Sequence, residues 1–209
     1  KKPDFRIRSG SPWKDHGYLY ELYENAFTPW EWQGKLFSEA KKLGLEAFSS
    51  PFDLSSVEYL ETLDVPAYKI ASPEITDIKL LETVARKGKP VIVSTGLAEA
   101  NDIALAIDTL RGAGAHSLIL LKCTTAYPAP LEEINLRMIP EFRNRFGCLA
   151  GLSDHTLGFV ASLGAVALGA CLIEKHFVLS REDKSVDSFF SLDQTEFSEL
   201  VKTVRDLER

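Results

Sequence analysis

Residues 117–124 read SLILLKCT, an apolar run that ends in small polar residues. The run lacks the strict alternation of apolar and polar side chains that marks a half-exposed strand. It therefore predicts a strand covered on both faces, as in a parallel sheet. Runs of the same kind, each ending in small polar or ionisable residues, occur at 47–50, 67–72, 90–95, 149–154 and 172–178.

Amphipathic segments lie between these runs, so strand and helix patterns alternate along the chain. Thr28 is expected to cap a helix with Pro29 at its first position, and Ser55 to open a capping box with Glu58. Glycines 44, 88, 112 and 147 are expected to close helices. The predicted helices occupy 54–63, 77–87, 99–112, 132–145, 157–169 and 194–209.

The alternation favours one of two folds: an open doubly wound sheet or a (β/α)₈ TIM barrel. Polar residues end every predicted strand, which favours the barrel, because all strand ends of a barrel meet at one mouth. Glycine-rich nucleotide-binding signatures are absent from the sequence. The fold class is therefore predicted as α/β, with residues 1–209 a partial TIM-barrel catalytic domain of about six of the eight βα units and the first strands missing.

The composition excludes several classes of function. A formal net charge of −6 is the opposite of what a nucleic-acid binder or a polybasic membrane anchor needs. No apolar stretch reaches the roughly 18 residues of a membrane helix. Three scattered cysteines form no disulfide framework, so we expect a cytoplasmic protein that binds neither nucleic acid nor membrane.

Two histidines end consecutive predicted strands. His155 and His176 would meet at the barrel mouth, which is the placement that two ligands of one divalent metal require. The alternative is that each is a hydrogen-bonded polar residue at a strand end. His16 and His116 have no such placement and are expected on the surface.

One lysine and several hydroxyl side chains form a second candidate cluster. A phosphate or carboxylate requires this mixture of charge and oriented donors, although each hydroxyl taken alone is also a common helix cap. The lysine lies in an apolar run and requires an anionic partner if it is buried. The cluster consists of Lys69, Ser72, Ser94, Thr125 and Ser153.

Acidic residues and a thiol complete the candidates. Glu74 and Asp187 lie beside the predicted mouth and can accept hydrogen bonds or move protons there, but loop solvation explains them equally well. Glu174 shares strand parity with His176, so it either tunes the site or pairs with an interior cation. Cys123 has no positioned base near it in the sequence and is interpreted as a small buried thiol.

Five motifs, in order and covering nearly the whole chain, resemble the motif series of the sialic acid synthases. They are VPAYKIAS (65–72), STG (94–96), CTTAYPAP (123–130), GLSDHT (151–156) and IEKHF (173–177). Within that family the segments TPWEW (28–32), FSSPFD (48–53), DS (187–188) and FSL (190–192) most resemble the pseudaminic acid branch.

The resemblance implies an enzyme that condenses phosphoenolpyruvate with an amino sugar. It implies a (β/α)₈ barrel followed by a small antifreeze-like domain, in a domain-exchanged homodimer with a divalent metal, Mn²⁺ or Mg²⁺. By the same resemblance His155 and His176 hold the metal and the lysine and hydroxyl cluster holds phosphoenolpyruvate. Glu74, Tyr127 and Asp187 match positions near the sugar.

The implied reaction gives pseudaminic acid and phosphate from a 2,4-diacetamido-2,4,6-trideoxy-hexose of the altrose type. Legionaminate or N-acetylneuraminate synthesis is the alternative within the family. A barrel aldolase that releases no phosphate, and an inactive barrel fragment acting as a binding or assembly module, are alternatives of other classes. The family's first two strands and its C-terminal domain have no counterpart in the sequence, so the chain alone is expected to be inactive.

Overall fold

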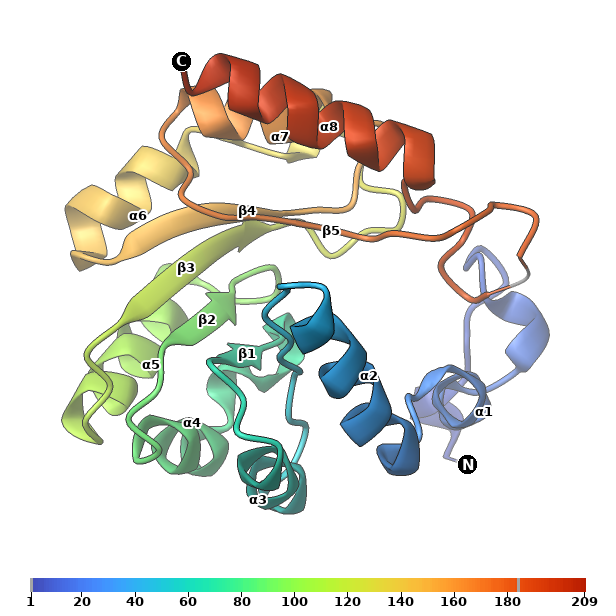
Figure 1. The fold of residues 1–209 in the computed structure, drawn as a ribbon. Helices are drawn as coiled ribbons and strands as arrows, with labels where there is room; N and C mark the ends of the chain where they lie inside the picture. The colour runs from blue at the N-terminus through green and yellow to red at the C-terminus, as the bar shows by residue number, and fades with distance from the viewer. Residues whose placement is uncertain (1, 184) are drawn as a thin grey trace.

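A computed structural model describes residues 2–183 and 185–209. Its centre is a parallel sheet of five strands whose spatial order, β1-β2-β3-β4-β5, is also their order in the sequence. The sheet curls like part of a barrel wall, and helices α4 to α8 lie outside it (Figure 1). The strands are β1 (Tyr68–Ile70), β2 (Val91–Ser94), β3 (Leu118–Cys123), β4 (Leu149–Asp154) and β5 (Ile173–Lys175).

Helices connect each strand to the next, which confirms the alternation of strand and helix expected from the sequence. Short 3₁₀ helices occupy Pro3–Phe5, Lys14–His16, Ser72–Thr76 and Leu131–Glu133. The α-helices are α1 (Leu19–Ala26), α2 (Trp30–Lys42), α3 (Leu54–Thr62), α4 (Ile78–Ala85), α5 (Ala100–Gly112), α6 (Met138–Phe146), α7 (Val160–Ala167) and α8 (Gln194–Leu207). No helix in the described part of the chain is long and apolar enough to cross a membrane.

Five of the six predicted strands are confirmed, and the strand predicted at 47–50 is wrong. That segment lies beside β1, where the Ser49 carbonyl accepts one long backbone hydrogen bond, 3.5 Å, from the Lys69 amide. One such bond does not make a ladder. Phe48, the one large apolar residue of the segment, is 40% exposed, so 47–50 is neither paired as a strand nor packed in the core.

The helix predicted at 132–145 begins only at Met138, as α6, and three other details of the predicted helix ends also need correction. Pro29 is the N-cap of α2 and not its first residue, because its extended backbone (ψ 137°) lies outside the helix, and no side chain caps it. The capping box of α3 joins Asp53 to Ser56 and does not start at Ser55, since the aspartate carboxylate accepts from the Ser56 amide at 2.7 Å. Gly112 is the last residue of α5, and Gly114 (φ +106°) makes the turn that follows.

The two faces of the sheet bury different kinds of side chain. On the outer face, alternate strand residues such as Ile70, Val93 and Leu120 pack with the helices in one apolar core. The residues between them, including Ile92 and Leu121, point to the concave inner face. The inner face is thus apolar in its middle, and its polar residues gather toward the carboxyl ends of the strands.

Gly151 marks a close approach between β4 and the chain entering β5. A Cβ atom there would lie 2.8 Å from Leu121 Cδ2 and would also collide with the Leu172 carbonyl. The strand spacing in this part of the sheet therefore requires glycine.

We predict that Gly151→Ala lowers the free energy of unfolding by about 1–3 kcal/mol, because a backbone carbonyl must move to admit the methyl group. The matched control is Gly112→Ala, since nothing lies within 4 Å of a Cβ placed there. Chemical denaturation of both variants of the full-length protein checks this. Equal stability of the two variants would contradict the close approach.

Candidate active site

The candidate site lies at the carboxyl ends of the strands, on the inner side of the curl. Lys69, Ser72, Ser94 and Ser153 are all buried there, between 2% and 7% exposed. Thr125 is exposed at the edge of the same group. The structure thus brings the predicted lysine and hydroxyl cluster together, although its residues come from four different strand ends.

Gly96 is the point on which several of these side chains converge. Its amide donates to Ser72 Oγ at 3.0 Å. A Cβ at this position would lie 2.9 Å from Cys123 Sγ and would collide with Thr125 Oγ1. Side chains that follow β1 and β3 can therefore approach this point only because residue 96 has no side chain of its own.

Glu174 neutralises the buried lysine. Its Oε2 lies 3.4 Å from Lys69 Nζ, and its Oε1 accepts from Ser153 Oγ at 2.6 Å. The expectations that Lys69 has an anionic partner and that Glu174 pairs with an interior cation are both confirmed. Two other polar atoms of the site, Ser94 Oγ and Glu74 Oε2, are buried without a hydrogen-bond partner.

The two histidines lie side by side, with their ring centroids 5.2 Å apart. His155 Nδ1 is 3.0 Å from the Thr124 carbonyl, which can only accept, so this nitrogen carries the proton in the neutral ring. His176 Nδ1 is 3.5 Å from Asp187 Oδ2. Nε2 is therefore the nitrogen of His176 left to bind a ligand, whereas the second nitrogen of His155 also faces the hydrogen bond with the Cys123 thiol.

The pKa of His155 is raised even though burial, the largest single influence, lowers it. The Cys123 thiol, the Thr124 carbonyl and the charge of Glu174 together outweigh burial. Burial raises the pKa of Cys123, but hydrogen bonding to His155, Ser72 and Ser153 outweighs it and leaves that pKa lowered. Cys123 is buried, which confirms the interpretation as a buried thiol, and the base absent from the sequence around it is supplied by His155 from the end of the next strand.

Aromatic rings form one wall of the site. The Tyr127 ring lies 4.4 Å from His155 and 6.3 Å from His176, and Phe190 lies 4.7 Å from His176. Trp13 packs against Tyr127 at 5.5 Å and donates its indole N–H to the Val186 carbonyl. Burial raises the pKa of Tyr127 to about 12, so its phenol is a neutral hydrogen-bond donor at physiological pH.

The sequence did not predict where Phe190, Trp13 and Asp154 would lie relative to the site. Phe190 and Trp13 come from segments far apart in the sequence, and no local pattern indicated that they meet at Tyr127. Asp154 lies between Ser153 and His155 at the end of one strand. Because adjacent strand residues point to opposite faces, this position could have predicted a polar side chain on the face opposite to the site.

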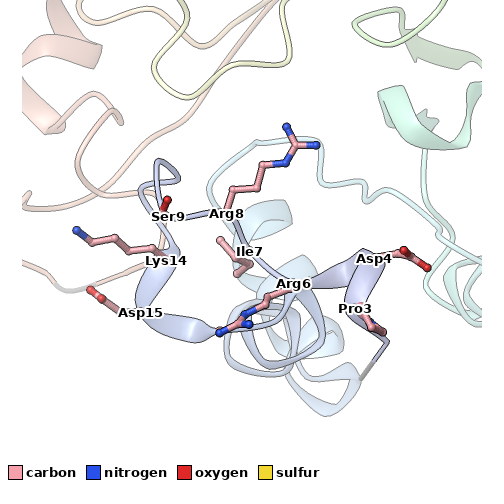
Figure 2. A pocket seen from close by; sticks show the side chains of 9 residues that line it. Pro3, Asp4, Arg6, Ile7, Arg8, Ser9, Lys14 and Asp15 are labelled. Carbon is pink, nitrogen blue, oxygen red and sulfur yellow. The ribbon is translucent and has the colours of Figure 1, made fainter.

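A large hollow of the molecule lies elsewhere. It has a volume of about 1010 Å³ and is lined by N-terminal residues that include Arg6, Arg8 and Lys14. Figure 2 shows these three side chains pointing in different directions, so they do not converge on one ligand. The strand ends, where polar groups do converge, are therefore the better candidate site.

We predict a pH-dependent effect for Glu74→Gln. Burial raises the pKa of Glu74, so the carboxyl favours folding while protonated and loses that contribution as the pH rises through its folded pKa. The variant, always neutral, should match the wild type in Tm at about pH 4 and exceed it at about pH 8.

Asp53→Asn is the control of opposite sign. The Ser56 amide, with Ser55 adding to it, holds the pKa of Asp53 below its usual value, so this variant should lose more Tm at about pH 8 than at low pH. If the difference in Tm between variant and wild type changed with pH in the same direction for both variants, the burial of Glu74 would be contradicted.

Comparisons with known proteins agree with the geometry. The profile of the NeuB family matches residues 1–209. The chain is 45% identical over 207 residues to a pseudaminic acid synthase of Campylobacter jejuni, covering 99% of this chain and 60% of that protein. It is 41% identical over 177 residues to an N,N'-diacetyllegionaminic acid synthase of the same species, covering 84% of this chain and 53% of that one.

A solved structure has the same fold. The N-acetylneuraminic acid synthetase of Leptospira borgpetersenii, determined with citrate, superimposes with a TM-score of 0.83 and 32% identity, over 86% of this chain and 63% of that one. The chain spans about 60% of the length of the first curated relatives that it matches. The resemblance seen in the sequence motifs is confirmed, and the chain belongs to the NeuB family.

Proposed function

We propose that the full-length protein carrying this chain condenses phosphoenolpyruvate with a 2,4-diacetamido-2,4,6-trideoxy-hexose of the altrose type, giving pseudaminic acid and phosphate. The similarity to pseudaminic acid synthases supports the choice of product. The observation that carries the proposal is the buried group of donors, Lys69 with Ser94 and Ser153, beside the paired histidines.

Phosphoenolpyruvate is proposed to bind among these donors through its phosphate and carboxylate. The Glu174 carboxylate now accepts from Ser153 and pairs with Lys69, so both donors bind a carboxylate group, and the substrate would take over or share these bonds. Ser94 Oγ is buried without a partner and would gain one from the substrate. Ser72 and Thr125 complete the proposed set around Gly96.

His155 and His176 are proposed to hold Mn²⁺ or Mg²⁺. Their Nδ1 atoms are engaged by Thr124 and Asp187, and their Nε2 atoms would bind the metal, His155 giving up its hydrogen bond with the Cys123 thiol, so the donor set fits. Among residues 2–183 and 185–209 no group of three or more His, Cys, Asp or Glu side chains is arranged to hold a metal, so the proposal rests on the histidine pair alone. When bound, the cation acts as a Lewis acid toward the sugar aldehyde.

The proposed reaction forms one carbon–carbon bond. C3 of phosphoenolpyruvate attacks the aldehyde carbon, C2 gains oxocarbenium character, water adds at C2, and phosphate leaves with cleavage of the C2–O bond. Tyr127, a neutral donor, lies beside both histidines and would orient the sugar oxygens. Glu74 and Asp187 would accept hydrogen bonds from the sugar or hold a proton there.

Three further features remain part of the proposal. They are a complete barrel of eight units, an antifreeze-like domain after the chain, and a homodimer of the full-length protein. The solved relative is longer than this chain and shares its fold, which supports additional structure around the half-barrel.

We predict phosphate release by the full-length protein given phosphoenolpyruvate, Mn²⁺ and the altrose derivative, and its loss on adding a chelator. His155→Ala should slow release at least about 10-fold, while His116→Ala, an exposed histidine, should leave it unchanged. Phosphate release only with the legionaminic acid precursor or with N-acetylmannosamine would show that the proposed acceptor sugar is wrong. No release with any of the three sugars would reject the proposed function.

We predict that Ser94→Ala raises the KM for phosphoenolpyruvate roughly 10- to 100-fold without lowering Tm. In the substrate complex the variant lacks a hydrogen bond to a charged group of phosphoenolpyruvate. In the free protein it lacks only a hydroxyl that has no partner. Thr95→Val is the matched control, because Thr95 Oγ1 donates to the Leu121 carbonyl on the other face. It should lower Tm and leave KM unchanged, and the reverse pattern would contradict the assignment of Ser94.

A further inference from the structure

A buried ion pair lies directly behind the two histidines. Asp154 and Lys175 are partners in the β4–β5 register, and each precedes a histidine by one residue. Lys175 Nζ is 3.2 Å from Asp154 Oδ2, and the two side chains are 1% and 0% exposed. Since strand side chains alternate, this pair faces the helices while Ser153 and Glu174 face the site.

The pair also binds the backbone that follows His155. The Thr156 amide donates to Asp154 Oδ1 at 2.8 Å, and Lys175 Nζ donates to the Thr156 carbonyl at 2.5 Å. Ser162 Oγ, from α7, donates to Asp154 Oδ2 at 2.6 Å. The chain that follows His155 is therefore held through both the backbone amide and the backbone carbonyl of Thr156.

Stability alone is a weak reason for such a pair. Removing two charges from water costs most of what their attraction returns, and apolar residues of similar volume often stabilise a protein equally well. An apolar pair cannot bind the amide and carbonyl of Thr156. What the ion pair adds is a fixed geometry for the strand ends, and those ends carry the two imidazoles.

We propose that the Asp154–Lys175 ion pair is a positioning device for His155 and His176. Acting through the backbone, it sets the separation of the two rings, whose centroids are 5.2 Å apart, so that both reach one divalent cation. The inference rests on the metal site of the proposed function. Neither member of the pair touches the cation or the substrate.

The test uses three measurements on the full-length protein. Mn²⁺ affinity is measured from the electron paramagnetic resonance signal of free Mn²⁺. The visible spectrum of bound Co²⁺ reports the geometry of the site, and Tm reports stability. Asp154→Asn and Lys175→Met should each weaken Mn²⁺ binding about 10- to 100-fold and lower Tm, because each leaves a buried charge unpaired. The neutral double variant should recover Tm but not Mn²⁺ affinity, and its Co²⁺ spectrum should differ from that of the wild type.

Two further variants separate positioning from general stability. Ser162→Ala keeps both charges and removes one hydrogen bond to Asp154, so we expect a few-fold loss of Mn²⁺ affinity. Lys89→Met removes the ion pairs to Glu61 and Asp64 before the start of β2. It should lower Tm and leave both metal readouts unchanged.

Failure of the inference and failure of the metal site give different results. If His155→Ala and His176→Ala both bind Mn²⁺ as the wild type does, the proposed metal ligands are wrong. If both weaken binding while the double variant of Asp154 and Lys175 keeps wild-type affinity and an unchanged Co²⁺ spectrum, the metal site stands and the positioning role is rejected.

Discussion

The ion pair between Lys69 and Glu174 joins the first and last strands of the sheet across its concave face. Four intervals of about 4.8 Å would separate β1 from β5 by about 19 Å in a flat sheet, further than these two side chains reach. Their nitrogen and oxygen are 3.4 Å apart. The contact therefore requires the curl, and the curl in turn follows from strand twist and from helices packed on the convex side.

The same curl explains why polar groups gather at one end of the inner face. Ile92 and Leu121 are buried in the middle of the concave side, so the inner face is apolar below the strand ends. A lysine held above this apolar layer is costly unless an anion lies beside it, and Glu174 supplies that anion. The Ser94 hydroxyl is buried without a hydrogen-bond partner, and a bound ligand would satisfy it.

Much of this arrangement could be predicted from the sequence because two simple rules apply. Parallel strands covered on both faces read as apolar runs, and their carboxyl ends meet, so polar residues ending separate runs were expected to converge. The rules failed where one run did not pair, at 47–50, and where contact depends on distances between loops. The approach of Cys123 to His155, and of Trp13 to Tyr127, follows from the curvature and not from any local pattern.

Alternating residues at the strand ends have two different roles: one set faces the proposed site, and the other is bonded on the helix side. Ser153 and His155 face the proposed substrate and metal, while Asp154 between them is bonded to Lys175 and α7 on the other side. Because adjacent residues point to opposite faces, neither task can be altered by shifting the strand without disturbing the other. The helix-facing residues thus limit how far the site can move. A geometry accurate enough for two imidazoles to share one ion is a property of both faces of the sheet, and not of the mouth alone.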